Sequence, residues 1–152
     1  MIPAARPDGY LPAGIHQAPW TEFERRYDVT PHRHILLQGL QSALVELSGA
    51  GCPRLYVGGS FLTPKPDPND IDCCFDYAHD LDWARLAAAD LLNTANDSAA
   101  QRARYGCEFH FANMAITMFG PIAATITFLE FYQRNVDGEP VGVVALDLGS
   151  FP

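Results

Sequence analysis

The sequence predicts one α+β domain, a small mixed sheet flanked by helices. The chain has 152 residues, the usual size of a single domain. Its composition, 48% hydrophobic and 18% charged, supplies a packed core and excludes global disorder. Helical and strand patterns alternate irregularly along the chain, which is typical of a mixed α/β or α+β arrangement. We therefore expect one domain over residues 1–152, with an extended N-terminal arm over residues 1–19 that holds four of the twelve prolines.

The first helix is expected over residues Trp20–Tyr27. Thr21 is a suitable N-cap, and Glu24, three residues later, completes a capping-box pattern. Trp20 is placed to form the hydrophobic staple of that motif. This helix is expected to serve packing.

A longer helix is predicted from Pro31 to about Ser48. Proline is well tolerated in a first helical turn, and Gly49 and Gly51 are suited to end the helix. The apolar residues that share one face are Ile35, Leu36, Leu40, Ala43, Leu44 and Leu47.

Two short strands follow. The first is Arg54–Gly58, and the second is Asp70–Asp76, in which acidic and apolar residues alternate at its start. A proline-rich loop, Thr63–Asn69, separates them. The remaining expected elements are helices over about Leu81–Leu92, Ser98–Tyr105 and Thr125–Arg134, strands over Cys107–Phe111 and Val141–Leu148, and a turn at Asp137-Gly138.

Charge and cysteine content narrow the function classes. Ten basic and eighteen acidic residues give a net charge of −8, a field that repels phosphate backbones and excludes a general nucleic-acid coat protein. No apolar run approaches the roughly 20 residues that cross a bilayer, and the N-terminus lacks the order of a signal peptide, so we expect a cytoplasmic protein without membrane contact. The cysteines form no C-x-x-C pair and are expected to be reduced thiols, not zinc ligands: Cys52, Cys73, Cys74 and Cys107.

The most informative segment runs from the first expected strand to the second. The first strand ends in Gly58-Gly59-Ser60, where two glycines let the backbone approach a polyphosphate and offer N–H donors and a hydroxyl. Asp70 and Asp72 are separated by one residue in a strand, so both carboxylates project from the same face. Adjacent acids of this kind suit Mg²⁺ or Mn²⁺, which prefer hard oxygen ligands.

This pattern resembles the signature of the nucleotidyltransferase superfamily with the polymerase-beta-like fold: Gly59-Ser60, a spacer of nine residues and Asp70-Ile-Asp72. The resemblance implies that the two acids bind catalytic metal and that a third acid on a later strand completes the site. Three further segments make the chain similar to a small family of bacterial and phage proteins assigned to that superfamily: residues 11–16, 20–23 and 100–106.

Glu108 is our choice for the third acid. It lies in the alternating run Cys107–Phe111, with His110 on the same face, which is the strand context that the resemblance requires. Glu130, in an expected helix, and Asp147, near the chain end, are weaker candidates. His110 is the only histidine expected at the site; the others are read as surface or packing residues, namely His16, His32, His34 and His79.

Three cations are candidates for contacts to the nucleotide. Lys65, in the proline-rich loop, can reach a triphosphate or can simply keep the loop solvated. Arg102 and Arg104 can balance phosphate charge or form an ordinary solvated helix face.

The expected reaction is nucleotidyl transfer from a nucleoside triphosphate, ATP being the expected one, to a hydroxyl on a protein, an RNA end or a small molecule. Asp70, Asp72 and Glu108 would hold Mg²⁺ or Mn²⁺, and Gly58, Gly59 and Ser60 would hold the phosphates. A long nucleic-acid track is the least expected acceptor because the chain is acidic.

The alternative is an interaction protein that keeps this fold with little catalysis, such as an antitoxin-like partner of a toxin or a phage or defence modulator. The run Cys73-Cys-Phe-Asp76, the three prolines of the spacer and the lack of a basic platform favour it. In a third interpretation, a purely structural α+β domain, the motif is coincidence.

Overall fold

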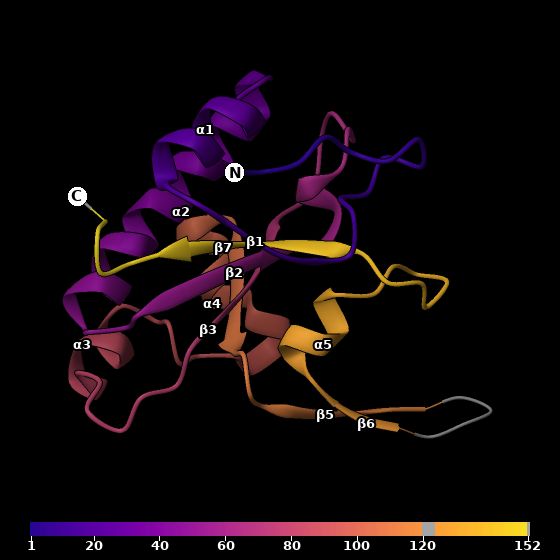
Figure 1. Cartoon of the computed structure of the whole chain (residues 1–152). Coiled ribbons are helices and arrows are strands. Elements are labelled where there is room, and N and C mark those ends of the chain that lie inside the picture. Colours follow the sequence, from indigo (N-terminus) through magenta and orange to yellow (C-terminus); the bar gives the residue numbers. More distant parts are fainter. Residues whose placement is uncertain (120–123, 152) are drawn as a thin grey trace.

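The computed structural model describes residues 1–119 and 124–151, and its centre is a five-stranded mixed sheet (Figure 1). The strand order is β1-β7-β2-β3-β4. The two outer pairs, β1 with β7 and β3 with β4, are parallel, and β2 is antiparallel to both of its neighbours. The strands are β1 (Gly14–Ala18), β2 (Arg54–Gly58), β3 (Ile71–Phe75), β4 (Cys107–Phe111) and β7 (Gly142–Asp147). Together with the helices, this sheet confirms the predicted α+β class.

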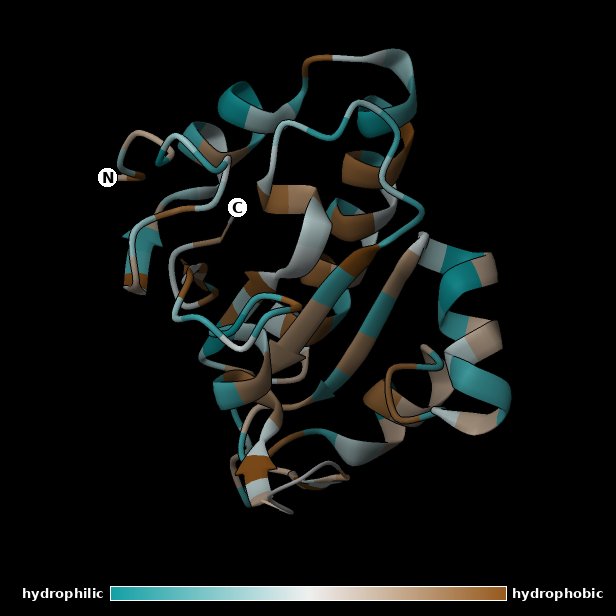
Figure 2. Ribbon diagram, turned by 90° about the vertical axis from the view of Figure 1, so that its right-hand side faces the viewer, coloured by the Kyte–Doolittle hydropathy of each residue, from teal (hydrophilic) through white to brown (hydrophobic). Residues whose placement is uncertain are grey.

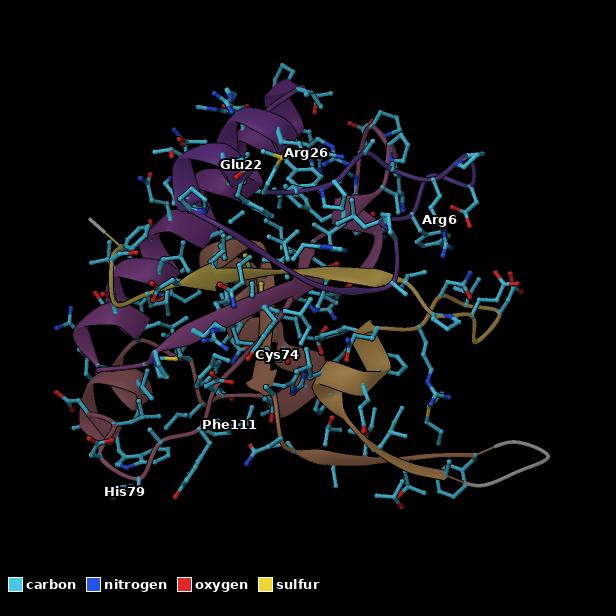
Figure 3. All side chains as sticks on the ribbon, viewed as in Figure 1. Arg6, Glu22, Arg26, Cys74, His79 and Phe111 are labelled. Carbon is cyan, nitrogen blue, oxygen red and sulfur yellow. The ribbon has the colours of Figure 1, made fainter. Side chains whose placement is uncertain are left out.

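The helices divide between the two faces of the sheet. The larger core joins one sheet face to α1 and α2 and contains Val57 and Cys73, whereas Tyr56 and Cys74 belong to a smaller core under α5. Neighbouring strand residues point to opposite faces, so the alternation explains this division. Cys74 accordingly lies beside α5 (Figure 3). The helices are α1 (Trp20–Tyr27), α2 (Pro31–Gly49), α3 (Trp83–Ala88), α4 (Ala95–Tyr105) and α5 (Phe128–Tyr132).

Hydropathy along the ribbon follows these two cores. Figure 2 shows the central strands as largely brown ribbons interrupted by teal bands. The buried cysteines carry no disulfide: all four are free thiols, as expected from their spacing. None of the described helices is both long and apolar enough to cross a membrane.

The two N-terminal helices occupy the predicted ranges, but their N-termini are capped in different ways. Helix α2 has Thr30 as its N-cap, whose hydroxyl accepts a hydrogen bond from the Arg33 backbone N–H at 3.1 Å. For α1, the predicted capping role of Thr21 is wrong: Pro19 is the N-cap, no side chain caps the helix, and Thr21 is exposed. Trp20 is the first residue of the helix and is buried in the core, which leaves Thr21 inside the first turn.

The N-terminal arm contributes more than an extended tail. Residues Gly14–Ala18 form β1, which pairs in parallel with β7 at the edge of the sheet. Ile2 and Leu11 are buried in the larger core. The arm is therefore an integral part of the domain.

The helix predicted over Leu81–Leu92 is shorter than expected, whereas the one predicted over Ser98–Tyr105 begins three residues earlier, at Ala95. Helix α3 covers only Trp83–Ala88, and Asp90, just after it, has a φ of +61°, which a right-handed helix cannot accommodate. Helix α4 matches its predicted end at Tyr105, although residues 96–98 at its start have left-handed backbone angles.

The helix predicted over Thr125–Arg134 forms only at Phe128–Tyr132. Its first part forms β6 (Ala124–Thr127), which pairs with β5 (Ala115–Met118) in a separate two-stranded sheet. A capping box then starts α5: Thr127 Oγ1 accepts from the Glu130 N–H, and the Glu130 carboxylate accepts from the Thr127 N–H at 2.8 Å. The β-branched residues before the cap favour a strand over a helix.

Arg33 ties the proline-rich loop to α2. This side chain is only 2% exposed, yet its guanidinium has no acidic partner within the described residues. It donates to the backbone carbonyls of Phe61 at 2.8 Å, Thr63 at 2.7 Å and Lys65 at 2.6 Å. Its guanidinium also lies over the Phe61 ring, 4.7 Å from the centroid. One arginine therefore fixes the chain that follows the glycine turn.

Replacing Arg33 with methionine should lower the free energy of unfolding by about 2–4 kcal/mol, because several carbonyl groups lose a charged donor in a buried setting. Urea denaturation followed by circular dichroism measures the loss. The control Arg25→Met alters an exposed residue of α1 and should change stability by less than about 0.5 kcal/mol. Equal unfolding free energies for Arg33→Met and wild type would contradict this role.

Candidate metal centre

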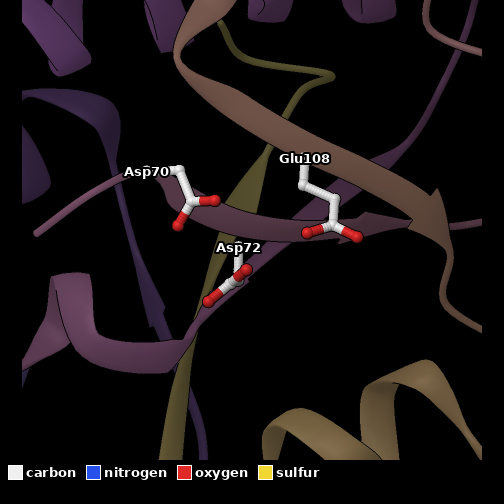
Figure 4. Close-up of side chains that lie close together, drawn as sticks. All are labelled: Asp70, Asp72 and Glu108. Atoms are coloured by element: carbon white, nitrogen blue, oxygen red, sulfur yellow. The ribbon is translucent and has the colours of Figure 1, made fainter. Parts of the chain in front are cut away.

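Three carboxylates meet at the N-terminal ends of the parallel strands β3 and β4. Asp70 directly precedes β3, Asp72 lies within it, and Glu108 lies in β4. Each offers an oxygen, and these oxygens lie within 4.8 Å of one another. Figure 4 shows the three side chains converging on one space. The structure thus brings together the three acids that the sequence singled out.

Strand register explains this convergence. Asp72 is paired with Gly58 of β2 on one side and with Glu108 of β4 on the other. Residues in one row across a sheet project from the same face, so Gly58, Asp72 and Glu108 share a face. Asp70 is two residues before Asp72 and projects from that same face.

The glycines are required at this place by space and by backbone angle. A Cβ on Gly58 would lie 2.7 Å from the Cβ of Tyr132, which shows that this face is the one covered by α5. Gly59 has a φ of +69°, and a Cβ there would clash with the Asp72 carboxylate. The glycine turn therefore lets the backbone lie directly beside Asp72. A pocket of hard oxygen donors next to a bare backbone fits a divalent cation with a phosphate ligand.

The charge state of Asp72 reflects its surroundings. Burial, followed by repulsion from Asp70 and Glu108, raises the pKa of Asp72 to about 6. Burial also raises the pKa of Asp70, although the nearby Arg102 charge opposes the shift. The pKa of Glu108 is instead lowered, mainly by its hydrogen bond with His110. Within the cluster, Asp72 is thus the carboxyl whose negative charge is least compensated.

Arg102 is the cation at the site. Its Nη1 lies 3.0 Å from Asp70 Oδ2, and its Nη2 lies 2.7 Å from Glu108 Oε2. Arg104, which we also considered for phosphate contacts, points elsewhere: it pairs with Asp90 at 3.2 Å and with the Ala88 carbonyl at 3.1 Å. Residues two positions apart in a helix point in different directions, so only one of these two arginines can face the acids.

His110 supports Glu108. Its Nε2 lies 2.6 Å from Glu108 Oε1, and its ring stacks on Phe128 at a centroid distance of 3.9 Å. The imidazole is therefore held between α5 and the cluster. The other histidines are packing or surface residues, as expected: His16 and His32 hydrogen-bond to backbone carbonyls, His34 pairs with Asp28, and His79 is exposed.

The two other candidate acids are engaged in contacts of their own. Glu130 is engaged in the capping box of α5, and Asp147 accepts a hydrogen bond from the Gly149 N–H at the end of β7. Lys65 has an exposed side chain, whereas its carbonyl is held by Arg33. The Ser60 hydroxyl makes no hydrogen bond to the part of the chain that the structure describes, so it is available to a ligand.

A cavity of about 630 Å³ opens beside the acids, within the size range of small-molecule sites. Its lining includes Gly59, Ser60, Asp72 and Glu108, together with aromatic side chains of α5 and a mixture of apolar and polar side chains from the segment that follows it. Sequence reasoning missed the wall formed by α5 and that segment, because Phe128, Phe131 and Tyr132 were expected only as part of a helix and Val141 only as the start of a strand. The lining residues there include Phe128, Phe131, Tyr132, Arg134, Val136 and Val141.

Replacing Asp72 with asparagine should stabilise the protein at about pH 7.5 in the presence of a chelator, by about 1–3 kcal/mol. The pKa of Asp72 is raised to about 6 in the folded state from an ordinary value of 3.8. The folded state therefore binds the proton more tightly, and stability declines as the pH rises between these two values. Asparagine removes that decline.

Urea titrations at about pH 4 and about pH 7.5 check this expectation, since the difference should shrink at the lower pH. Asp67→Asn, at an exposed position of the loop, is the matched control. A destabilised Asp72→Asn at the higher pH would show that the carboxylate is compensated without a cation.

Comparisons with known proteins place the chain in a family but give no activity. Residues 3–147 match a family of unknown function, DUF6932. No curated protein and no solved structure matches the chain. Since the match covers nearly its whole length, the chain belongs to the DUF6932 family of proteins of unknown function.

Proposed function

We propose that this protein is a metal-dependent nucleotidyltransferase, which moves a nucleoside monophosphate from a nucleoside triphosphate to a hydroxyl acceptor. The observation that carries the proposal is the row Gly58, Asp72 and Glu108 across three strands, with Asp70 and the glycine turn at its side. The triad alone would be an acidic cluster. The adjoining bare backbone and the cavity make it a site for a phosphate-bearing ligand.

The chain's own groups would divide the work between them. The backbone N–H groups of Gly59 and Ser60 and the free Ser60 hydroxyl would hold the terminal phosphates. Asp70, Asp72 and Glu108 would hold Mg²⁺ or Mn²⁺. The bound cation would favour ionisation of the acceptor hydroxyl and would stabilise the charge that develops on the leaving oxygens.

The proposed reaction balances without a covalent protein intermediate. The acceptor oxygen forms a bond to the α-phosphorus, the bond from that phosphorus to the bridging oxygen breaks, and pyrophosphate leaves with the electron pair. The proton of the acceptor hydroxyl passes to solvent. No oxidant or reductant takes part.

The cavity supports a nucleotide as the donor. Its acidic end and glycine turn are continuous with a wall that contains Phe128, Phe131 and Tyr132. Aromatic side chains stack on any nucleobase, so this wall fits the base while the phosphates lie at the turn. ATP is the expected donor, and the acceptor is a protein, an RNA end or a small molecule.

A second candidate function is a nucleotidyltransferase-like interaction protein, antitoxin-like or a phage or defence modulator, with little catalysis. One observation favours it: Arg102 already compensates Asp70 and Glu108. A chain that has lost its metal could keep its acids in this way. Measured transfer separates the two functions.

The decisive experiment follows label from ATP carrying ³²P at the α-phosphate into acceptors of a cell extract, with Mn²⁺ present. Wild type should transfer label, and Asp72→Asn should lose about 100-fold or more because the cation that stabilises the developing negative charge would lose a ligand. Asp67→Asn should retain wild-type transfer. Absence of transfer by wild type under all divalent cations would favour the interaction protein.

Phe131→Ala should weaken binding of Mn²⁺-ATP about 10-fold, because a stacking surface in the cavity is lost. Phe131 is 39% exposed, so its truncation should leave the fold intact. Isothermal titration calorimetry gives the Kd. Tyr77→Ala removes another exposed aromatic ring, outside the cavity lining, and should bind like wild type. Equal affinities of Phe131→Ala and wild type would place the base elsewhere.

A further inference from the structure

Arg102 connects three acidic side chains from one position on α4. Besides its contacts to Asp70 and Glu108, its Nη2 lies 3.7 Å from the exposed Asp97. Its side chain is 36% exposed, so it reaches the acids from the solvent side. Arg102 therefore contacts the cluster from beside the cavity, whose lining includes Asp72 and Glu108 but not Arg102 itself.

The fold holds the base of this side chain firmly. Gly106 is the C-cap of α4, with a φ of +65°. Its N–H donates to the Arg102 carbonyl at 2.8 Å. The Gly106 carbonyl in turn accepts from the Ile71 N–H of β3 at 3.0 Å. This short connection places Arg102 directly above Glu108, six residues later.

The contacts of Arg102 with the acids are incomplete. It uses one oxygen of Asp70 and one oxygen of Glu108, while its Nε is buried without a hydrogen-bond partner among the described residues. Its ion pairs do not extend to Asp72. A planar guanidinium can instead bind phosphate oxygens with two parallel hydrogen bonds. A ligand with several anionic oxygens can therefore take the place of Asp70 and Glu108 as the ion-pair partner of Arg102.

We propose that Arg102 is an internal counter-ion: it holds Asp70 and Glu108 together in the metal-free protein and turns to the phosphates of the nucleotide when a divalent cation takes over those carboxylates. This inference rests on the proposed function. It adds that the cation and the triphosphate bind cooperatively, with Arg102 as the coupling group.

The coupling has a clear physical origin. A cation that binds alone must displace Arg102 from Asp70 and Glu108. Arg102 is then left without a close anionic partner, since among the described residues only the exposed Asp97 remains, at 3.7 Å. A triphosphate supplies that partner, so each ligand makes the binding of the other more favourable by the same factor. Typical coupling of this kind is 5–150-fold.

Mn²⁺ titrations followed by electron paramagnetic resonance test the proposal, with and without an ATP analogue whose α,β-bridge is a methylene group. In wild type, the analogue should lower the Kd for Mn²⁺ about 10-fold or more. In Arg102→Gln, Mn²⁺ alone should bind about 10-fold more tightly, because a competing positive charge is absent, and the analogue should change its Kd by less than about 3-fold.

Arg104→Gln is the matched control, since it removes a charge from the same helix without touching the cluster; it should behave like wild type. Arg102→Lys keeps the positive charge but loses the two-pronged geometry, so Mn²⁺ alone should bind as in wild type with reduced coupling. This variant keeps the test intact if Arg102→Gln does not fold.

The outcomes separate the two proposals. Equal Mn²⁺ affinity and equal coupling in wild type and the Arg102 variants, or weaker Mn²⁺ binding by Arg102→Gln, overturns the role of Arg102 and leaves the proposed function standing. Absence of Mn²⁺ binding by wild type and by both Arg102 variants overturns both.

Discussion

The register of β3 against its two neighbours is the constraint on which the site depends. Asp72 is paired with Gly58 of β2 on one side and with Glu108 of β4 on the other. If β3 or β4 slipped by one residue in this register, an acidic side chain would point into the larger core. That shift is prevented because Ile71 and Cys73, on the opposite face, are fully buried. The hydrophobic effect on one face of the sheet therefore holds the carboxylates in place on the other.

The elements around this row restrict it further. Gly58 brings α5 close to the sheet, and Gly59 turns the chain sharply beside Asp72. Arg33, which lies on α2, then holds the loop that follows the glycine turn through three of its backbone carbonyls. Buried polar groups are costly unless they are satisfied, so this hydrogen-bonded loop is more rigid than its proline-rich composition alone suggests. A rigid scaffold of this kind suits a site in which several oxygens must keep their spacing.

The elements that sequence reasoning predicted well are those with a strong local pattern. Apolar spacing identified α2, although Ile35, which was expected on the apolar face, is 65% exposed. Acid-apolar alternation identified β3 and the face shared by Asp70 and Asp72. Helix capping was less predictable: Thr21 carries the capping-box pattern, yet burial of Trp20 sets the start of α1. Strand β1 pairs with a strand that is distant in the sequence, and β5 and β6 are short and pair only with each other. None of the three has a local hydropathy pattern that stands out from the surrounding chain. Arg33 was invisible because its partners are backbone carbonyls 28–32 residues away.

Charge compensation gives the three acids distinct roles. Asp70 and Glu108 share Arg102, and Glu108 also has His110, so these two carboxylates are stable in the protein as it stands. Asp72 has no such partner within the described residues, is the most enclosed by the glycine turn, and lies in the centre of the row. A half-buried acid with two other carboxylates beside it is costly for a chain to keep when a neutral residue would pack as well. The arrangement is understandable if the missing positive charge is supplied from outside, and a divalent cation beside the glycine turn is the ligand that the proposed function would place there.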